Sequence, residues 1–168
     1  MKKTAFTILE LLVVIVAFSI IVGVVLNVYG VSLDIWNEGF KRSDIRTELS
    51  QTLELVTKNL RRATSIDALT DSSITFTADL GSGSTTYRVY LYNAADPEPN
   101  PPYTQSTYDL RWVQGTTSYG SGASLANNII QPSSPVFSQA GNVINVNLTA
   151  AEGDETVRLS SSVRPRNL

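Results

Sequence analysis

The sequence of 168 residues contains neither cysteine nor histidine. Without cysteine, no disulfide can stabilise the fold and no thiolate can act as a nucleophile or metal ligand. Without histidine, the chain lacks the commonest general base and the commonest metal ligand. This excludes Ser-His-Asp and Cys-His catalysis and most zinc sites. We therefore expect a protein that is not an enzyme and that carries no cofactor.

Excess positive charge is also lacking. Lys and Arg total 13 residues against 15 Asp and Glu, whereas a protein that binds nucleic acid presents a concentrated basic face. We expect no nucleic-acid partner. The acidic residues Glu152, Asp154 and Glu155 cluster near one glycine, and such clusters can bind calcium. Their spacing does not match an EF-hand loop, so a solvated turn is the favoured interpretation.

A long charge-free run is present near the N-terminus. The 23 residues from Leu11 to Leu33 carry no charge, and at ~1.5 Å per residue a helix of this length spans roughly 34 Å, enough to cross a hydrocarbon core of about 30 Å. Lys2 and Lys3 precede the run, which predicts a single-pass helix with a cytoplasmic N-terminus. A cleaved secretory signal is disfavoured because the apolar run is too long, the acidic Glu10 stands at its start and no A-x-A cleavage site follows it.

Glu10 lies at the start of this apolar segment. A carboxylate in a membrane costs on the order of 2.5 to 3.5 kcal/mol at the centre and less near the interface, so Glu10 predicts a cationic partner. The alternative is a tolerated interfacial acid whose side chain reaches the lipid headgroups.

The segment from Lys2 to Ile15, KKTAFTILELLVVI, resembles the N-terminal signal of type IV pilins and type II secretion pseudopilins. That signal has a short basic leader, a small residue, and a phenylalanine followed by TLIE or similar and a pure apolar run. The resemblance implies cleavage between Ala5 and Phe6 by a prepilin peptidase and N-methylation of the new Phe6 amine. It also implies that Glu10 pairs with the Phe6 amine of a neighbouring subunit. Ala5 stands where glycine is commonest in the family.

Beyond the apolar run, hydrophobic residues continue at steps of three and four through Leu60 and Ala63, which is the stripe of an amphipathic helix. We expect one helix from near Phe6 to about Ser65, with bending or local melting between Gly23 and Gly30. The expected boundaries are a leader at 1–5, a membrane or filament-core helix at 6–33, the amphipathic half of the same helix at 34–66 and a β-rich domain at 67–168.

The remainder of the chain predicts strands separated by glycine and proline. Two antiparallel hairpins are expected, the first with Tyr87, Val89 and Leu91 facing inward and Tyr90 facing outward. The strands are expected at residues 73–79, 85–93, 108–114, 136–137, 143–149 and 156–163, with an irregular stretch that includes residues 125–130 before the last three. A loop at 94–104 contains four prolines and is expected to be exposed. The fold class is α+β, with a long helix packed on small antiparallel sheets.

The LRRA sequence at 60–63, the LANNI sequence at 125–129 and the C-terminal arginine-asparagine pair resemble minor pseudopilins of the J type and minor pilins of the W type. This resemblance implies a ladle-shaped minor subunit that initiates or caps a type IV pilus or a secretion pseudopilus. Its implied partners are other minor and major pilins or pseudopilins, the prepilin peptidase and the bacterial inner membrane. Its location would be that membrane and then a periplasmic or surface filament. The alternative function is a surface adhesion module anchored by an uncleaved helix.

Overall fold

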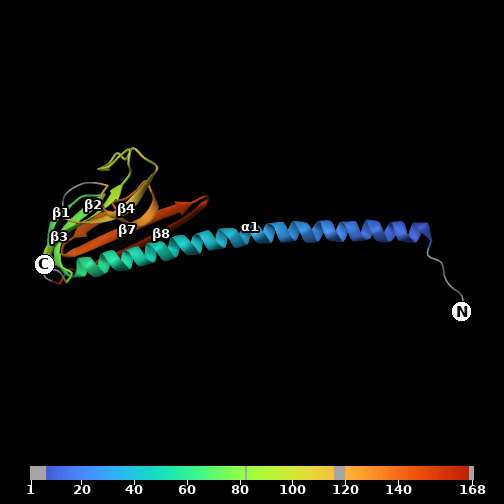
Figure 1. Cartoon of the computed structure of the whole chain (residues 1–168), viewed down its shortest axis with the longest axis horizontal. Coiled ribbons are helices and arrows are strands. Elements are labelled where there is room, and N and C mark those ends of the chain that lie inside the picture. The colour runs from blue at the N-terminus through green and yellow to red at the C-terminus, as the bar shows by residue number, and fades with distance from the viewer. Residues whose placement is uncertain (1–6, 82, 116–119, 167–168) are drawn as a thin grey trace. The chain divides into compact units, whose positions relative to one another are not determined.

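The computed structural model describes residues 7–81, 83–115 and 120–166. The chain divides into two compact units, residues 1–40 and 41–168. One helix, α1 (Ile8–Arg61), contributes to both units and is 54 residues long (Figure 1). It is helical at Gly23 and Gly30, so the expected local melting is absent. Each glycine weakens a helix by only ~1 kcal/mol relative to alanine, and no proline interrupts this one.

The helix ends earlier than the sequence predicts. The amphipathic half was expected to continue to residue 66, but α1 ends at Arg61 and a strand begins at Ala63. The Ala63 side chain is fully buried, and the strand pairs with residues 74–78 of the next one. The backbone N–H and C=O groups of this segment therefore bond to β2. The free energy of that pairing outweighs the helical preference of the side chains.

The sheet is antiparallel throughout the described part of the chain. Its strands are β1 (Ala63–Leu69), β2 (Ser73–Asp79), β3 (Ser84–Tyr92), β4 (Thr107–Gln114), β5 (Ala123–Ile130), β6 (Phe137–Ala140), β7 (Val143–Glu152) and β8 (Glu155–Val163). They form one connected sheet in the order β1-β2-β3-β4-β5-β7-β6, and β8 pairs with β7. The sequence predicted several small sheets, no strand at β1 and an irregular stretch where β5 lies. The other strands lie where they were expected, with small shifts at their ends.

Both predicted hairpins are confirmed. In the first, β2 and β3 pair from Ser73 opposite Tyr90 to Asp79 opposite Ser84. In the second, β7 and β8 pair down to Glu152 opposite Glu155. Gly153 has φ 63° at the first position of that turn, a backbone conformation that glycine adopts without steric cost.

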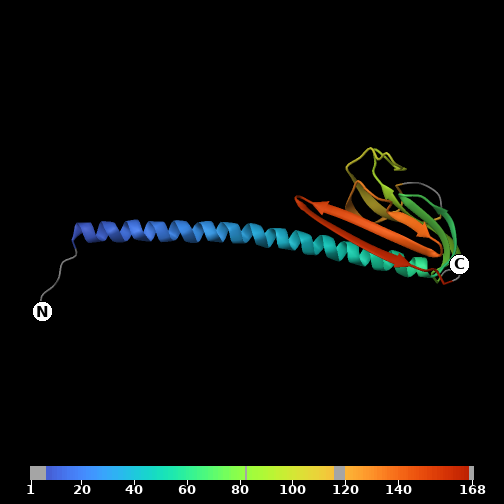
Figure 2. The same cartoon turned by 180° about the vertical axis from the view of Figure 1, so that it is seen from behind.

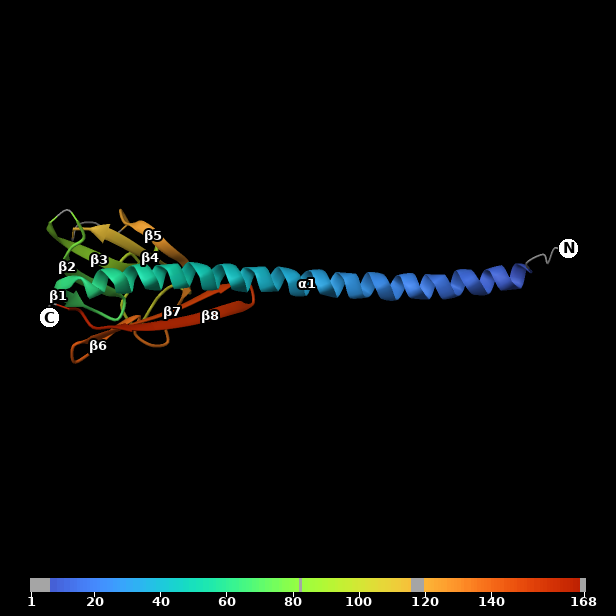
Figure 3. The same ribbon diagram turned by 90° about the horizontal axis from the view of Figure 1, so that it is seen from below.

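The core of the second unit lies between α1 and the sheet. Figure 3 shows the outer part of α1 running across the sheet, with β5 to one side and β8 to the other. From the helix, Leu49, Val56 and Leu60 are at most 1% exposed. The sheet contributes buried side chains from most of its strands, including Ile74, Phe76, Val89, Leu91, Leu110, Ile144, Val146 and Leu148. Each such side chain contributes about 1.5–3 kcal/mol by leaving water.

The burial of Tyr90, on the face of β3 away from the core, was not predicted. Tyr87, Val89 and Leu91 are buried as expected, but Tyr90 is also only 1% exposed. The segment around Gly122 covers it from the other face, because a Cβ at Gly122 would lie 2.9 Å from the Tyr90 hydroxyl. Sequence alternation predicts which side of a strand a residue occupies, but it does not reveal that a loop covers the second face.

Candidate membrane-spanning and assembly segment

The charge-free run predicted from the sequence lies wholly within α1 and within the first unit. Every described residue from 7 to 40 is exposed; Ile20 and Leu26, for example, are 63% and 64% exposed. A surface of this size made of bulky apolar side chains is unfavourable in water. The helix is long and apolar enough to cross a membrane. Such a surface is suited to contact with lipid or with other apolar helices.

The polar side chains inside the run fit such an environment. The Ser19 hydroxyl donates to the Ile15 carbonyl at 2.8 Å, and the Ser32 hydroxyl donates to the Val28 carbonyl at 2.7 Å. A hydroxyl that bonds within its own helix does not leave an unsatisfied donor in hydrocarbon. The serines are therefore compatible with burial in lipid.

The start of the helix brings Glu10 together with Thr7. The Glu10 backbone N–H lies 3.3 Å from the Thr7 hydroxyl oxygen and 3.1 Å from the Thr7 carbonyl oxygen, and it donates to both. This is half of a capping box, in which a threonine before the helix satisfies an N–H group of the first turn. The T-x-x-E spacing from Thr7 to Glu10 is the local sequence signal of such a cap.

The Glu10 carboxylate is exposed and has no ion-pair or hydrogen-bond partner among the described residues. Its negative charge in the first turn interacts favourably with the positive end of the helix dipole. The other predicted site residues, Lys2, Lys3, Ala5 and Phe6, lie outside the residues that the structure describes. The pairing of Glu10 with a neighbour's amine stays a prediction.

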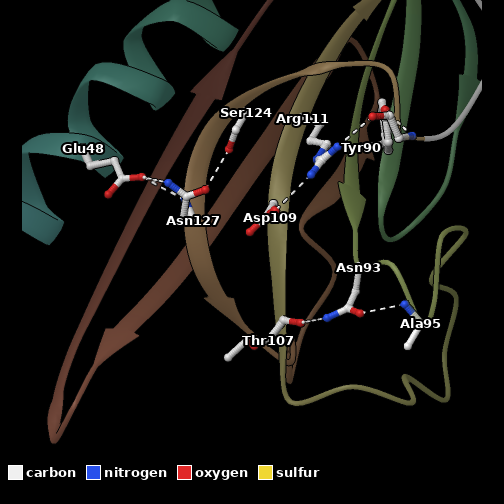
Figure 4. A network of polar contacts seen from close by, with 10 residues as sticks. Glu48, Tyr90, Asn93, Ala95, Thr107, Asp109, Arg111, Ser124 and Asn127 are labelled. Carbon is white, nitrogen blue, oxygen red and sulfur yellow. Dashed lines mark hydrogen bonds and ion pairs between the residues drawn. The ribbon is translucent and has the colours of Figure 1, made fainter.

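In the second unit, a carboxylate ties α1 to the sheet. Figure 4 shows Glu48 directed from the helix toward Asn127 of β5. Its Oε1 accepts from the Asn127 backbone N–H at 2.8 Å and from the Asn127 side-chain amide at 3.2 Å. One turn further along, the Thr52 hydroxyl donates to the Leu125 carbonyl at 2.7 Å. These bonds fix the LANNI segment to the helix. They account for the first of its two asparagines, Asn127, which bonds Glu48.

The next residue, Asn128, has φ 55°, a left-handed conformation that asparagine tolerates better than most residues. The pairing of β4 with β5 shifts register in this region, which is the mark of a bulge. No local pattern in the sequence predicts the contact with the helix, because Glu48 and Asn127 are 79 positions apart.

A second polar cluster covers the sheet face that carries Tyr90. The Arg111 guanidinium donates to the Gly120 carbonyl at 2.8 Å and lies 3.3 Å from an Asp109 oxygen. It also stacks over the Tyr92 ring, 4.1 Å from the ring centre. Figure 4 shows Arg111 directed toward Asp109. Arginine contacts of this kind hold loops and strands together, so we interpret this cluster as structural.

The proline-containing loop is tied at its base and lies on the side of the sheet away from α1 (Figures 1 and 2). Asn93 donates from its side-chain amide to the Thr107 carbonyl at 2.9 Å. Within the loop, Asp96 accepts hydrogen bonds from the hydroxyls of Thr104 and Tyr108, both at 2.9 Å. Pro99 is buried, so the prediction of a wholly exposed loop is wrong at this position.

The described ranges contain no metal-binding cluster. No group of three or more acidic, histidine or cysteine residues there could hold a metal ion. A cleft of about 120 Å³ lies beside β5 and β7, and its one charged lining residue is Arg158, which lies 3.4 Å from the Ser134 hydroxyl. The lining includes no pair of nucleophile and base in the sense that acyl or phosphoryl transfer needs.

Comparisons with known proteins found no matching family model, curated protein or solved structure. The functional interpretation therefore depends on the residues and geometry of this chain.

Proposed function

We propose that the chain is a pilin-like structural subunit with a ladle fold, of the minor type, in a type IV pilus or a type II secretion pseudopilus. The observation that carries the proposal is α1 itself. One uninterrupted helix joins a fully exposed, charge-free segment to a segment whose apolar side chains form the core of a β-rich domain. Such a helix needs lipid before assembly and neighbouring helices after it, which is what a filament subunit requires.

In this proposal the N-terminus faces the cytoplasm and the β-rich domain lies outside the inner membrane. A prepilin peptidase cuts between Ala5 and Phe6, and the new Phe6 amine is methylated. In the filament, the apolar half of α1 packs against the helices of other minor and major subunits. Glu10 then pairs with the Phe6 amine of a neighbour, because an unpaired charge buried among apolar helices is strongly unfavourable.

Mass spectrometry of the purified N-terminus tests the processing step. We expect a mature chain that begins with methylated Phe6. An intact Met1 would contradict the proposal and favour the alternative function, a surface adhesion module with an uncleaved helix. A cut after residue 33 would contradict both and indicate an ordinary secretory signal.

Glu10 supplies the test of assembly. We expect Glu10→Gln to leave membrane insertion intact and to reduce the incorporation of the subunit into filaments at least tenfold, because the loss of a buried charged partner costs about 3–5 kcal/mol. Incorporation is measured by the recovery of the subunit in sheared filaments, relative to its amount in the membrane.

The matched control is Thr7→Ala, which removes the capping hydroxyl near Glu10 and keeps the carboxylate. A lost cap costs about 1 kcal/mol of helix stability, so this variant should assemble almost normally. If Thr7→Ala and Glu10→Gln impair incorporation equally, Glu10 acts on the helix start and the pairing hypothesis is wrong.

A further inference from the structure

The end of the first unit carries an aromatic stripe on one side of α1, formed by Tyr29, Leu33, Trp36 and Phe40. Their spacing of four, three and four residues places them on one face of a helix. Trp36 and Phe40 pack edge to face with ring centroids 5.3 Å apart. They remain 65% and 54% exposed, so the pair covers little of its own surface.

This stripe extends the apolar surface of the helix beyond Asp34, the first charged residue after the charge-free run. Asp34 and Glu38 begin the charged part of the helix, and at 3.6 residues per turn they lie on the side opposite the stripe. The helix is therefore two-sided where it leaves the charge-free run. Such a boundary is suited to an interface between hydrocarbon and water, where tryptophan and tyrosine are enriched.

The polar atoms of the stripe, Tyr29 Oη and Trp36 Nε1, also suit an interface between hydrocarbon and water. Neither Tyr29 Oη nor Trp36 Nε1 has a hydrogen-bond partner among the residues that the structure describes, and both side chains are exposed. An aromatic ring with one polar end is favoured where its body is in hydrocarbon and its donor reaches headgroup oxygens. The stripe offers two such rings about ten ångströms apart along the axis, at ~1.5 Å per residue.

The opposite face favours helix contacts instead. Gly23, Asn27 and Gly30 follow one another at steps of four and three, and a Cβ added at either glycine would meet nothing within 4 Å. Small residues allow close approach between helices in a membrane, and an amide can bond across such a contact. The face of small residues is thus the one suited to neighbouring helices, which leaves the aromatic face for lipid.

We propose that this aromatic stripe is an interfacial anchor that binds the headgroup layer of the membrane on the side of the β-rich domain, and so fixes the depth of α1. The 26 helical steps from Glu10 to Trp36 span about 39 Å at ~1.5 Å each, close to the 40–45 Å thickness of a bilayer with its headgroups. With Trp36 in one headgroup layer, Glu10 lies in the other. The carboxylate is therefore hydrated before assembly and is buried only when subunits come together.

The proposal rests on the membrane-spanning part of the proposed function and not on processing or filament assembly. Its test uses the full chain in phosphatidylcholine–phosphatidylglycerol vesicles at a low ratio of protein to lipid, with bromine atoms at different depths in the lipid chains. The chain has two tryptophans. The emission of the unaltered chain minus that of Trp36→Phe isolates the signal of Trp36 without changing Trp112 in the folded domain.

We expect Trp36 emission to be blue-shifted and to be quenched more by bromines near the headgroups than by bromines near the chain ends. Stronger quenching by the deep bromines, or no quenching at all, would overturn the proposal. A Trp36 signal that depends on protein density rather than on bromine position would show that the stripe faces a second copy, which would also overturn it.

A second measurement tests the anchoring itself. Because the chain has no cysteine, Val31→Cys gives a single thiol, and its reaction with a water-soluble maleimide reports the depth of the helix. We expect the rate to rise several-fold when Trp36→Ser and Phe40→Ser are added. Ile35→Ser, which replaces an equally exposed side chain away from the stripe, should leave the rate unchanged. An equal rise in both variants would overturn the proposal, and neither result depends on whether filaments form.

Discussion

Tyr103 combines a buried hydroxyl with no hydrogen-bond partner among the described residues. Burial is the largest cause that raises its pKa to about 12 from an ordinary 10.0, and the charges of Asp71 and Tyr108 add to it. Because the pKa is higher in the folded state, the neutral form stabilises the fold below pH 10. That stabilisation is lost as pH rises through the window between 10 and about 12.

We therefore predict that Tyr103→Phe keeps the fold at least as stable at neutral pH, because phenylalanine removes an unsatisfied hydroxyl and keeps the ring. It should also weaken the loss of stability between pH 10 and 12, measured by chemical denaturation across that range. Tyr108→Phe is the contrasting variant. Its hydroxyl bonds Asp96 and the Gln105 backbone, so its removal should destabilise by about 1 kcal/mol. Equal losses in both variants at neutral pH would contradict this assignment.

Residues of this kind were the least predictable from the sequence. The prolines of the loop are a local signal, and they predicted a loop correctly. The hydrogen bond from Tyr108 to Asp96 joins residues 12 positions apart, and the bond from Gln131 to the Tyr103 carbonyl joins residues 28 positions apart. Such contacts depend on the tertiary fold, and no periodicity of single residues encodes them.

At the scale of elements, Glu48 is the polar contact that ties α1 to β5. We predict that Glu48→Ala destabilises the folded domain by about 1 kcal/mol, because the exposed backbone N–H and side-chain amide of Asn127 lose their charged acceptor. Glu54→Ala is the matched control, since Glu54 is an exposed carboxylate on the same helix and should change the free energy of unfolding by no more than about 0.5 kcal/mol. The measurement is urea denaturation followed by circular dichroism. Equal effects would show that Glu48 acts only through helix propensity.

Elements with a strong period were predicted well, and their ends were not. The alternation in β2, β7 and β8 and the long apolar period of α1 gave the correct type for each. The end of α1 was placed about four residues too late, because LRRA suits a helix and Ala63 suits either state. The pairing of β1 with β2 determines that Ala63 starts a strand. That pairing is a tertiary interaction, which a local sequence pattern does not predict.

At the scale of the whole chain, the core belongs entirely to the second unit. The first helical residue of the buried cluster is Ile45 and the last strand residue is Val163. Every described residue before 41 is exposed. Removal of the apolar half of α1 therefore removes no side chain from the core, while it removes the surface that requires lipid.

We predict that a fragment of residues 34–168 folds in water without detergent, with Asp34 placed to cap the shortened helix. It should unfold in one cooperative transition, with a Tm within a few degrees of that of the full chain in detergent. Leu49→Ala in this fragment should lower the free energy of unfolding by about 2–5 kcal/mol, since it empties a site in the core between helix and sheet. Leu55→Ala, at a position 42% exposed on the same helix, is the control and should cost much less. A fragment that aggregates or unfolds without cooperativity would show that residues 7–33 contribute to the folded domain, contrary to the division of the chain into two units.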